Sequence, residues 1–170
     1  MALRAELGKD APTGQDGTLA DLYQTTAEAL LIKGDYANAA AYAQKELLEW
    51  QRSRDNMADD QRSPGYQRTI SGARTRLAVA LAKQGKQYDA QKVIEPALAF
   101  YASPAVQKSD GVLLKAERAN VLYAAALAKP ENKKALLTQA AQLLDGLPAE
   151  VRAFWRVARG RADITAEMKK

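Results

Sequence analysis

The chain has 170 residues, a length that fits one domain with a core of its own. It contains no cysteine and no histidine. These absences exclude disulfides and thiol nucleophiles, and they remove the commonest general base and the commonest transition-metal ligand. The formal net charge is +5, from 25 basic and 20 acidic residues, which permits nucleic-acid binding without indicating it.

Sequence motifs typical of enzymes are not found. The chain has no glycine-rich phosphate loop, no Gly-x-Ser-x-Gly elbow and no metal-ligand spacing. The obvious carboxylate pairs are Glu46 with Glu49 and Asp59 with Asp60. Each pair would need one desolvated member before it could do acid–base work. We therefore expect a protein that is not an enzyme and that holds no cofactor or metal.

The sequence shows neither a secretory signal nor a membrane span. Its longest apolar run, residues 37–43, is too short to cross a bilayer. Residues 1–17, rich in Gly, Pro, Asp and Thr toward their end, predict a disordered linker. Because the chain opens on a linker and then enters a repeat, we expect a fragment of a longer protein. The expected location is cytoplasmic, with periplasmic exposure in a larger membrane protein left open.

Apolar residues at helical spacing begin after this segment. Residues 19–31 place leucine, tyrosine and alanine on one face, which predicts a helix with Thr18 as its N-cap and Gly34 as its end. The same spacing continues over residues 36–50 and predicts a second helix, which polar residues 51–54 can lengthen. The two helices would form a first hairpin.

A second pair of helices follows the breaker Ser63-Pro64-Gly65. The apolar spacing predicts helices over residues 70–81 and 90–101, with Gly85 ending the first of them. Pro96 lies inside the second helix and forfeits one backbone hydrogen bond. We expect a kink or a helix restart at this proline.

The third pair is predicted over residues 113–126 and 136–144, with Gly146 as a left-handed cap. A final helix is expected to start at Pro148, a natural first helical position, and to run through Val157. Residues 162–170 are expected to be a frayed tail. No sustained run alternates β-branched and polar residues, so the predicted fold class is all-α.

One pattern of small residues returns in the hairpins. Its first copy has a small residue in the first helix, a Gly-x-Tyr turn and an alanine that opens the second helix. The residues are Ala27, Gly34, Tyr36 and Ala39 in the first unit, Ala78, Gly85, Ala90 and a displaced Tyr88 in the second, and Ala135 in the third. Over residues 19–147 they resemble the tetratricopeptide repeat (TPR) family. The resemblance implies a right-handed superhelix of three antiparallel helical hairpins plus a C-terminal capping helix, over residues 18–161.

The spacing of the repeat is longer than the family's usual unit. Ala39, Ala90 and Ala135 lie 51 and 45 residues apart, against about 34 residues in the standard unit. This period is similar to that of extended repeats in C-terminal regions of bacterial multidomain signalling proteins, including serine/threonine kinases and transcriptional regulators.

The resemblance also implies a binding surface, because TPR domains commonly bind peptides on a concave face lined by their first helices. The residues near those positions here are Gln24, Glu28, Arg76, Lys83, Glu117 and Asn120. A solvated polar helix face is the simpler interpretation of the same residues. The Lys/Asn clamp that chaperone-binding members use on a C-terminal carboxylate is not reproduced. We expect that reversing Glu28 or Arg76 would weaken partner capture without lowering stability.

The expected function is a non-enzymatic protein–protein interaction module that docks a partner segment in its concave groove. The alternative is a sensory or regulatory domain of a larger bacterial signalling protein that binds a small effector or peptide. A homodimer is left open as well. The full-length open reading frame would distinguish the interaction module from the regulatory domain.

Arginines gather in two stretches, residues 52–76 and 152–161, either of which could bind phosphate. Acidic residues interleave with both stretches, and no platform of spaced aromatics accompanies them. The tyrosines and Trp50 lie at helical spacing among alanines, which favours a role as filler between helices. No nucleic-acid partner is therefore expected.

Overall fold

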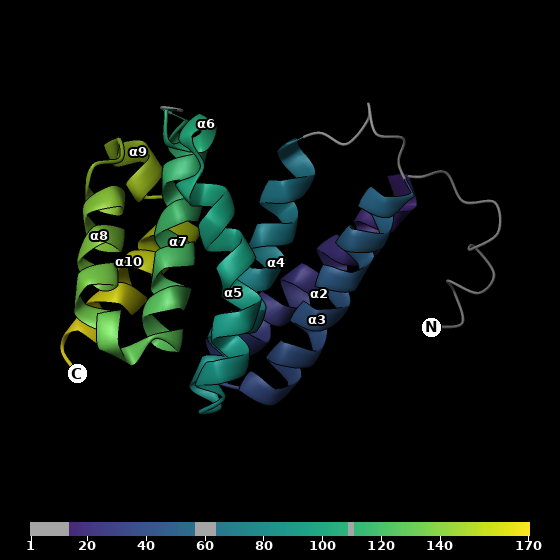
Figure 1. The fold of residues 1–170 in the computed structure, drawn as a ribbon, viewed down its shortest axis with the longest axis horizontal. Coiled ribbons are helices and arrows are strands. Elements are labelled where there is room, and N and C mark those ends of the chain that lie inside the picture. Colours follow the sequence, from purple (N-terminus) through teal and green to yellow (C-terminus); the bar gives the residue numbers. More distant parts are fainter. Residues whose placement is uncertain (1–13, 57–63, 109–110) are drawn as a thin grey trace.

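The computed structural model describes residues 14–56, 64–108 and 111–170, and these form helices without any strand (Figure 1). This confirms the all-α prediction. Six helices make three hairpins: α2 (Gly14–Lys33), α3 (Tyr36–Asp55), α4 (Pro64–Lys83), α5 (Gln87–Ala102), α7 (Val112–Ala128) and α8 (Lys133–Asp145). The other elements within the described residues are α6 (Pro104–Gln107), η2 (Pro130–Asn132), α9 (Ala149–Arg152) and the C-terminal α10 (Trp155–Met168).

Two glycines make the tight turns of the first two hairpins. Gly34 and Gly85 have φ angles of 82° and 80°, a left-handed conformation that disfavours residues with a Cβ. The next backbone N–H groups, of Asp35 and Lys86, bond to carbonyls five residues back at 3.0 Å. These bonds satisfy carbonyls that the helix end leaves without partners. The predicted stops at both glycines are confirmed.

The hairpins stack because their helices carry small side chains where the axes approach. Ala27, Ala39, Ala78 and Ala90 have no exposed surface, as the packing role of the repeat requires. Ala135 lies near the start of α8, the second helix of the third hairpin, but it is exposed, so it does not have the packing role of Ala39 and Ala90. In α8 the buried positions are Leu137, Ala140, Ala141 and Leu144. Three apolar clusters link neighbouring elements along the stack, one around α2 to α4, one around α4, α5 and α7, and one around α7, α8 and α10.

Several predicted boundaries differ from the structure. Thr18 lies inside α2, which begins at Gly14, so Thr18 is not its N-cap. Residues 1–13 of the predicted linker lie outside the described residues. The helix α5 runs through Pro96 without a restart. Gly146 has a φ of −78°, so it ends α8 without the predicted left-handed cap.

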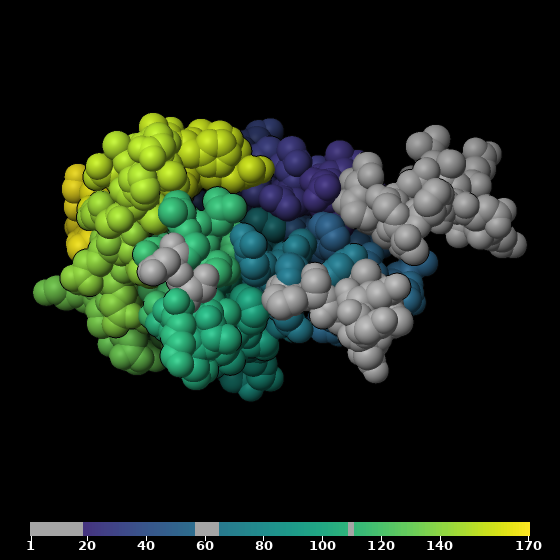
Figure 2. All heavy atoms as spheres, turned by 90° about the horizontal axis from the view of Figure 1, so that it is seen from above, coloured from purple at the N-terminus to yellow at the C-terminus, as the bar shows by residue number. Residues whose placement is uncertain are grey.

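The C-terminal segment departs most from its prediction. Pro148 is the N-cap of the short α9, and the final helix begins only at Trp155. Residues 162–168 are helical rather than frayed, because Ile164 is fully buried and Glu167 is 5% exposed. In Figure 1 this helix lies behind α7 and α8. Seen from above, the segment around α9 reaches the purple α2 (Figure 2).

The approach of α10 to α7 depends on a glycine. A β-carbon at Gly160 would lie 3.0 Å from Oδ1 of Asn120, closer than most Cβ contacts. The glycine therefore lets the two helices meet. Among the described helices, none is long and apolar enough to cross a membrane.

Candidate functional site

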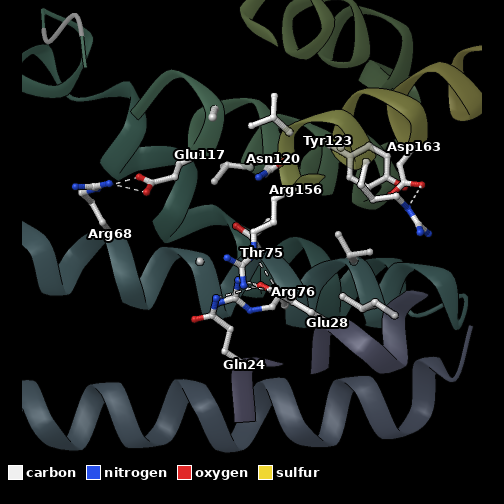
Figure 3. Close-up of a pocket in the computed structure, with 18 of the residues that line it drawn as sticks. Gln24, Glu28, Arg68, Thr75, Arg76, Glu117, Asn120, Tyr123, Arg156 and Asp163 are labelled. Carbon is white, nitrogen blue, oxygen red and sulfur yellow. Dashed lines mark hydrogen bonds and ion pairs between the residues drawn. The ribbon is translucent and has the colours of Figure 1, made fainter. Parts of the chain in front are cut away.

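A central cavity of about 900 Å³ lies between α2, α4, α7 and α10 (Figure 3). The first helices of the three hairpins line it, as expected for a concave face. The six residues predicted for the groove all line this cavity: Gln24, Glu28, Arg76, Lys83, Glu117 and Asn120. Their role in binding stays a prediction.

The fourth wall of the central cavity was not predicted. It consists of α10 and the residues just before it, which contribute Phe154, Trp155, Arg156, Arg159 and Asp163. The arginines of this helix were considered for phosphate binding and were not placed in the groove. The sequence signal that could have placed them is Gly160, since a glycine inside an amphipathic helix often marks a close helix–helix approach.

A chain of alternating charges crosses the floor of the cavity. Arg76 of α4 donates two hydrogen bonds to Glu46 of α3, one of them at 2.9 Å from Nε. It also approaches Oε1 of Glu28 on α2 at 3.4 Å, and Gln24 donates to the same oxygen at 3.1 Å. The other oxygen of Glu28 accepts from Nε and Nη2 of Arg156 on α10, at 3.2 and 3.0 Å. Four helices are thus joined by one row of charges.

The carboxyl group at the inner end of this row is the most buried. Glu46 has no exposed surface, and burial raises its pKa even though the hydrogen bond and charge of Arg76 act to lower it. Glu46 is therefore paired with Arg76 of α4. The other predicted carboxylate pair, Asp59 and Asp60, lies outside the described residues.

A second cluster links α4 to α7. Arg68 binds Glu117 through two hydrogen bonds of 2.9 and 2.6 Å, visible in Figure 3. The hydroxyl of Tyr101 donates to Glu117 at 2.8 Å. Burial first, and then this hydrogen bond to a carboxylate, raise the pKa of Tyr101 above its usual value. Tyr101 stays a neutral donor that orients Glu117.

The far end of α10 carries a third cluster. Glu167 accepts hydrogen bonds from Lys83, from Lys133 at 2.9 Å and from Lys170 at 2.8 Å. Burial alone would raise the pKa of Glu167, but the three lysines outweigh it and hold the pKa at about 2. Lys83 is therefore already engaged, although it lines the cavity.

The charges of the central cavity are balanced within the protein. Among the described residues that line it, five are cationic, and each has a carboxylate partner: Arg68, Arg76, Lys83, Arg156 and Arg159. The partners are Glu117, Glu46, Glu167, Glu28 and Asp163. Most of these pairs are at least partly shielded from water. The four arginines that line the cavity, all within the two stretches considered for phosphate binding, are thus paired with carboxylates, and a charged ligand there would have to displace one of them.

Large apolar side chains stand exposed where the cavity meets solvent. Ile32 is 51% exposed, Leu113 is 64%, Phe154 is 53% and Trp155 is 51%. Trp50 and Tyr66 also line the cavity, with their rings edge to face at 6.1 Å. The prediction that the aromatics only fill space between helices is therefore incomplete, because Trp50 faces the cavity. No group of three acidic side chains within the described residues is arranged to hold a metal ion.

Comparison with known proteins supports the fold. No family model matches the sequence, and no curated protein matches it significantly. A solved structure from Chlorobium tepidum TLS, determined at 2.54 Å resolution and described as a TPR-like protein, superposes with a TM-score of 0.66. The two sequences are 16% identical, and the match covers 92% of this chain and 96% of that one. At this identity the likeness concerns the fold alone, and this chain has a TPR-like fold.

Proposed function

We propose that the protein is a non-enzymatic interaction module whose central cavity docks an apolar, weakly charged segment of a partner protein. The observation that carries this proposal is the combination of paired charges and exposed apolar side chains around one cavity. TPR-like folds generally act as protein-interaction scaffolds, which supports the class of function. The nature of the segment follows from the cavity itself.

The paired charges argue against a strongly charged partner. Separating Arg76 from Glu46, which has no exposed surface, would leave a charge buried without its counterion. A carboxylate or ammonium group on the partner would have to replace such a pair with equal geometry. An uncharged segment avoids that exchange, and the polar residues then set its register without supplying most of the affinity.

The exposed apolar side chains supply the affinity. Burying a large apolar side chain completely is worth about 1.5–3 kcal/mol. Phe154 and Trp155 are each about half exposed, so each retains roughly half of that gain for a partner. Aromatic side chains that a partner desolvates are frequent anchors of binding energy. We assign the anchor role to Ile32, Leu113, Phe154 and Trp155.

A selection from random displayed peptides tests this function. Peptides selected on the intact protein should be apolar and weakly charged, and their affinity should fall about tenfold or more in Trp155→Ala and Leu113→Ala. The matched controls are Tyr88→Ala and Leu48→Ala, which remove exposed apolar side chains that do not line the cavity. Loss of binding in the controls, with full binding in the cavity variants, would place the docking surface elsewhere.

A small effector is the second candidate, and the cavity volume is the observation that favours it. A volume of about 900 Å³ lies within the range of about 300–1,000 Å³ that is typical of small-molecule sites. A small effector in this cavity would fit the alternative function, that of a sensory or regulatory domain within a larger signalling protein. A metabolite that raises the melting temperature of the protein, but not that of Trp155→Ala, would favour this function over peptide docking.

A further inference from the structure

The helix α10 is attached to the repeats with little apolar burial. Of its 14 residues only Ile164 is a fully buried apolar side chain. The neighbouring α7 buries eight residues, all apolar. Since apolar burial is the main source of stability for a docked helix, α10 should detach at a lower free energy than the hairpin helices.

Ion pairs fasten α10 instead. At its start Arg156, which is 46% exposed, binds Glu28 of α2. In the middle Arg161 binds Asp145 at the end of α8 through bonds of 2.7 and 2.9 Å, with side chains 36% and 53% exposed. At least one side chain of each pair reaches solvent, and pairs in contact with water contribute little to stability. Salt weakens them, because the screening length shortens to about 3 Å at 1 M ionic strength.

The backbone around α9 offers two points of bending. Pro148 and Phe154 are both extended, with ψ angles of 149° and 129°, on either side of the four-residue α9. Rotation at these two residues moves α10 without unwinding α8. Because α10 forms one wall of the central cavity, such a movement uncovers the surface of α7 around Asn120 and Tyr123.

We propose that α10 is a flap latched by ion pairs, which swings away from α7 and thereby opens the central cavity. The latch consists of the pairs Arg156–Glu28 and Arg161–Asp145, together with the lysines on Glu167. The inference that this opening admits the partner segment rests on the proposed function, whereas the inference that α10 moves does not. For a partner that binds only the open form, the apparent affinity equals the affinity for that form multiplied by the fraction of molecules that are open.

Spin labels test the movement directly. The chain has no cysteine, so Ala41→Cys on α3 and Ala162→Cys on α10, both exposed, give a single labelled pair. We expect one narrow distance distribution at low salt and an added longer component at about 1 M salt. Arg156→Gln should show the longer component already at low salt, whereas Arg152→Gln on α9 should not. The pair Ala41→Cys and Ala99→Cys, on α3 and α5, should stay narrow throughout.

A disulfide tests whether opening matters for binding. A β-carbon at residue 160 would lie 3.0 Å from Oδ1 of Asn120, so the side chains of residues 120 and 160 meet where α10 contacts α7. Cysteines at both positions should therefore lock α10 onto α7 when oxidised. A peptide from the selection above should bind the oxidised double variant about tenfold or more weaker than the same protein after reduction.

The outcomes separate the two proposals. A single narrow distance at every salt concentration, including in Arg156→Gln, overturns the flap, whatever peptides bind. Equal peptide affinity of the oxidised and reduced forms overturns the role of the flap in admission. A salt-dependent distance without any selected peptide overturns the proposed function and leaves the flap standing.

Discussion

Arg76 of α4 donates two hydrogen bonds to Glu46 of α3, and Glu46 has no exposed surface. Arg76 lines the central cavity and is itself only 17% exposed. The expectation that Arg76 could be reversed at no cost in stability treated it as a surface charge, and the burial of this pair argues against it. The two residues join the first hairpin to the second.

Removing Arg76 alone should therefore destabilise the protein. Arg76→Met leaves a buried carboxylate without its counterion, and we expect it to cost about 3–5 kcal/mol of unfolding free energy. The double variant Arg76→Met/Glu46→Gln should recover much of this loss, because it removes the buried charge. Urea unfolding measures both variants. Equal losses in the single and the double variant would show that the pair contributes through packing and not through charge.

Acid should weaken the attachment of α10. The folded protein holds the pKa of Glu167 at about 2, below its ordinary value of 4.5. A lowered pKa in the folded state contributes stability that is present above pH 4.5 and is lost as the pH falls toward 2. Unfolding free energies measured over this range should fall more steeply for the wild type than for Glu167→Gln. The comparison cancels the opposite contribution of Glu46, whose raised pKa is common to both proteins. Parallel curves would contradict the prediction.

Enlarging the small residues between helices should destabilise the stack. Ala39→Leu and Ala90→Leu insert a larger side chain where no surface is exposed, and each should cost about 1–3 kcal/mol. Ala135→Leu is the matched control on an exposed helix face and should change stability by less than about 0.5 kcal/mol. A large loss in the control would mean that Ala135 is packed in the same manner as its predicted counterparts.

Replacing a turn glycine by alanine should lower stability, whereas replacing the glycine that ends α8 should not. Gly34→Ala places a β-carbon in open space but in a left-handed conformation, so it should cost about 1–2 kcal/mol. Gly146→Ala keeps an ordinary φ of −78° and should leave stability unchanged or raise it by about 0.4–1 kcal/mol. Thermal unfolding of both variants checks the sign. A destabilised Gly146→Ala would point to its contact with the carbonyl of Gln142.

Local sequence pattern predicted the parts of this structure that local physics decides. The helix ends at Gly34 and Gly85 and the buried Ala39 and Ala90 follow from residue type and helical spacing. The face of the first helices followed from the repeat, so Glu28 and Asn120 were placed on the cavity.

What could not be predicted depends on contacts between distant segments. The helix α10 stays folded at its end because Ile164 is buried against the repeats and Glu167 meets lysines from α4 and α8. Neither contact leaves a periodic signal in the sequence, so a polar tail appeared to fray. For the same reason the sequence does not show that the four charged groove residues, Glu28, Arg76, Lys83 and Glu117, already bind charged groups of the protein itself.

The bond between Glu28 and Arg156 also bears on how the whole chain unfolds. In a linear array each unit touches only its neighbours, so either end can melt while the rest stays folded. This bond joins residues 128 positions apart and connects α2 to α10, so the two ends of the described array of helices are held together. Fraying of the first hairpin then also releases the final helix. Unfolding should accordingly be more cooperative at low ionic strength than at high ionic strength, where salt screens the bond between Glu28 and Arg156 and the two ends unfold independently.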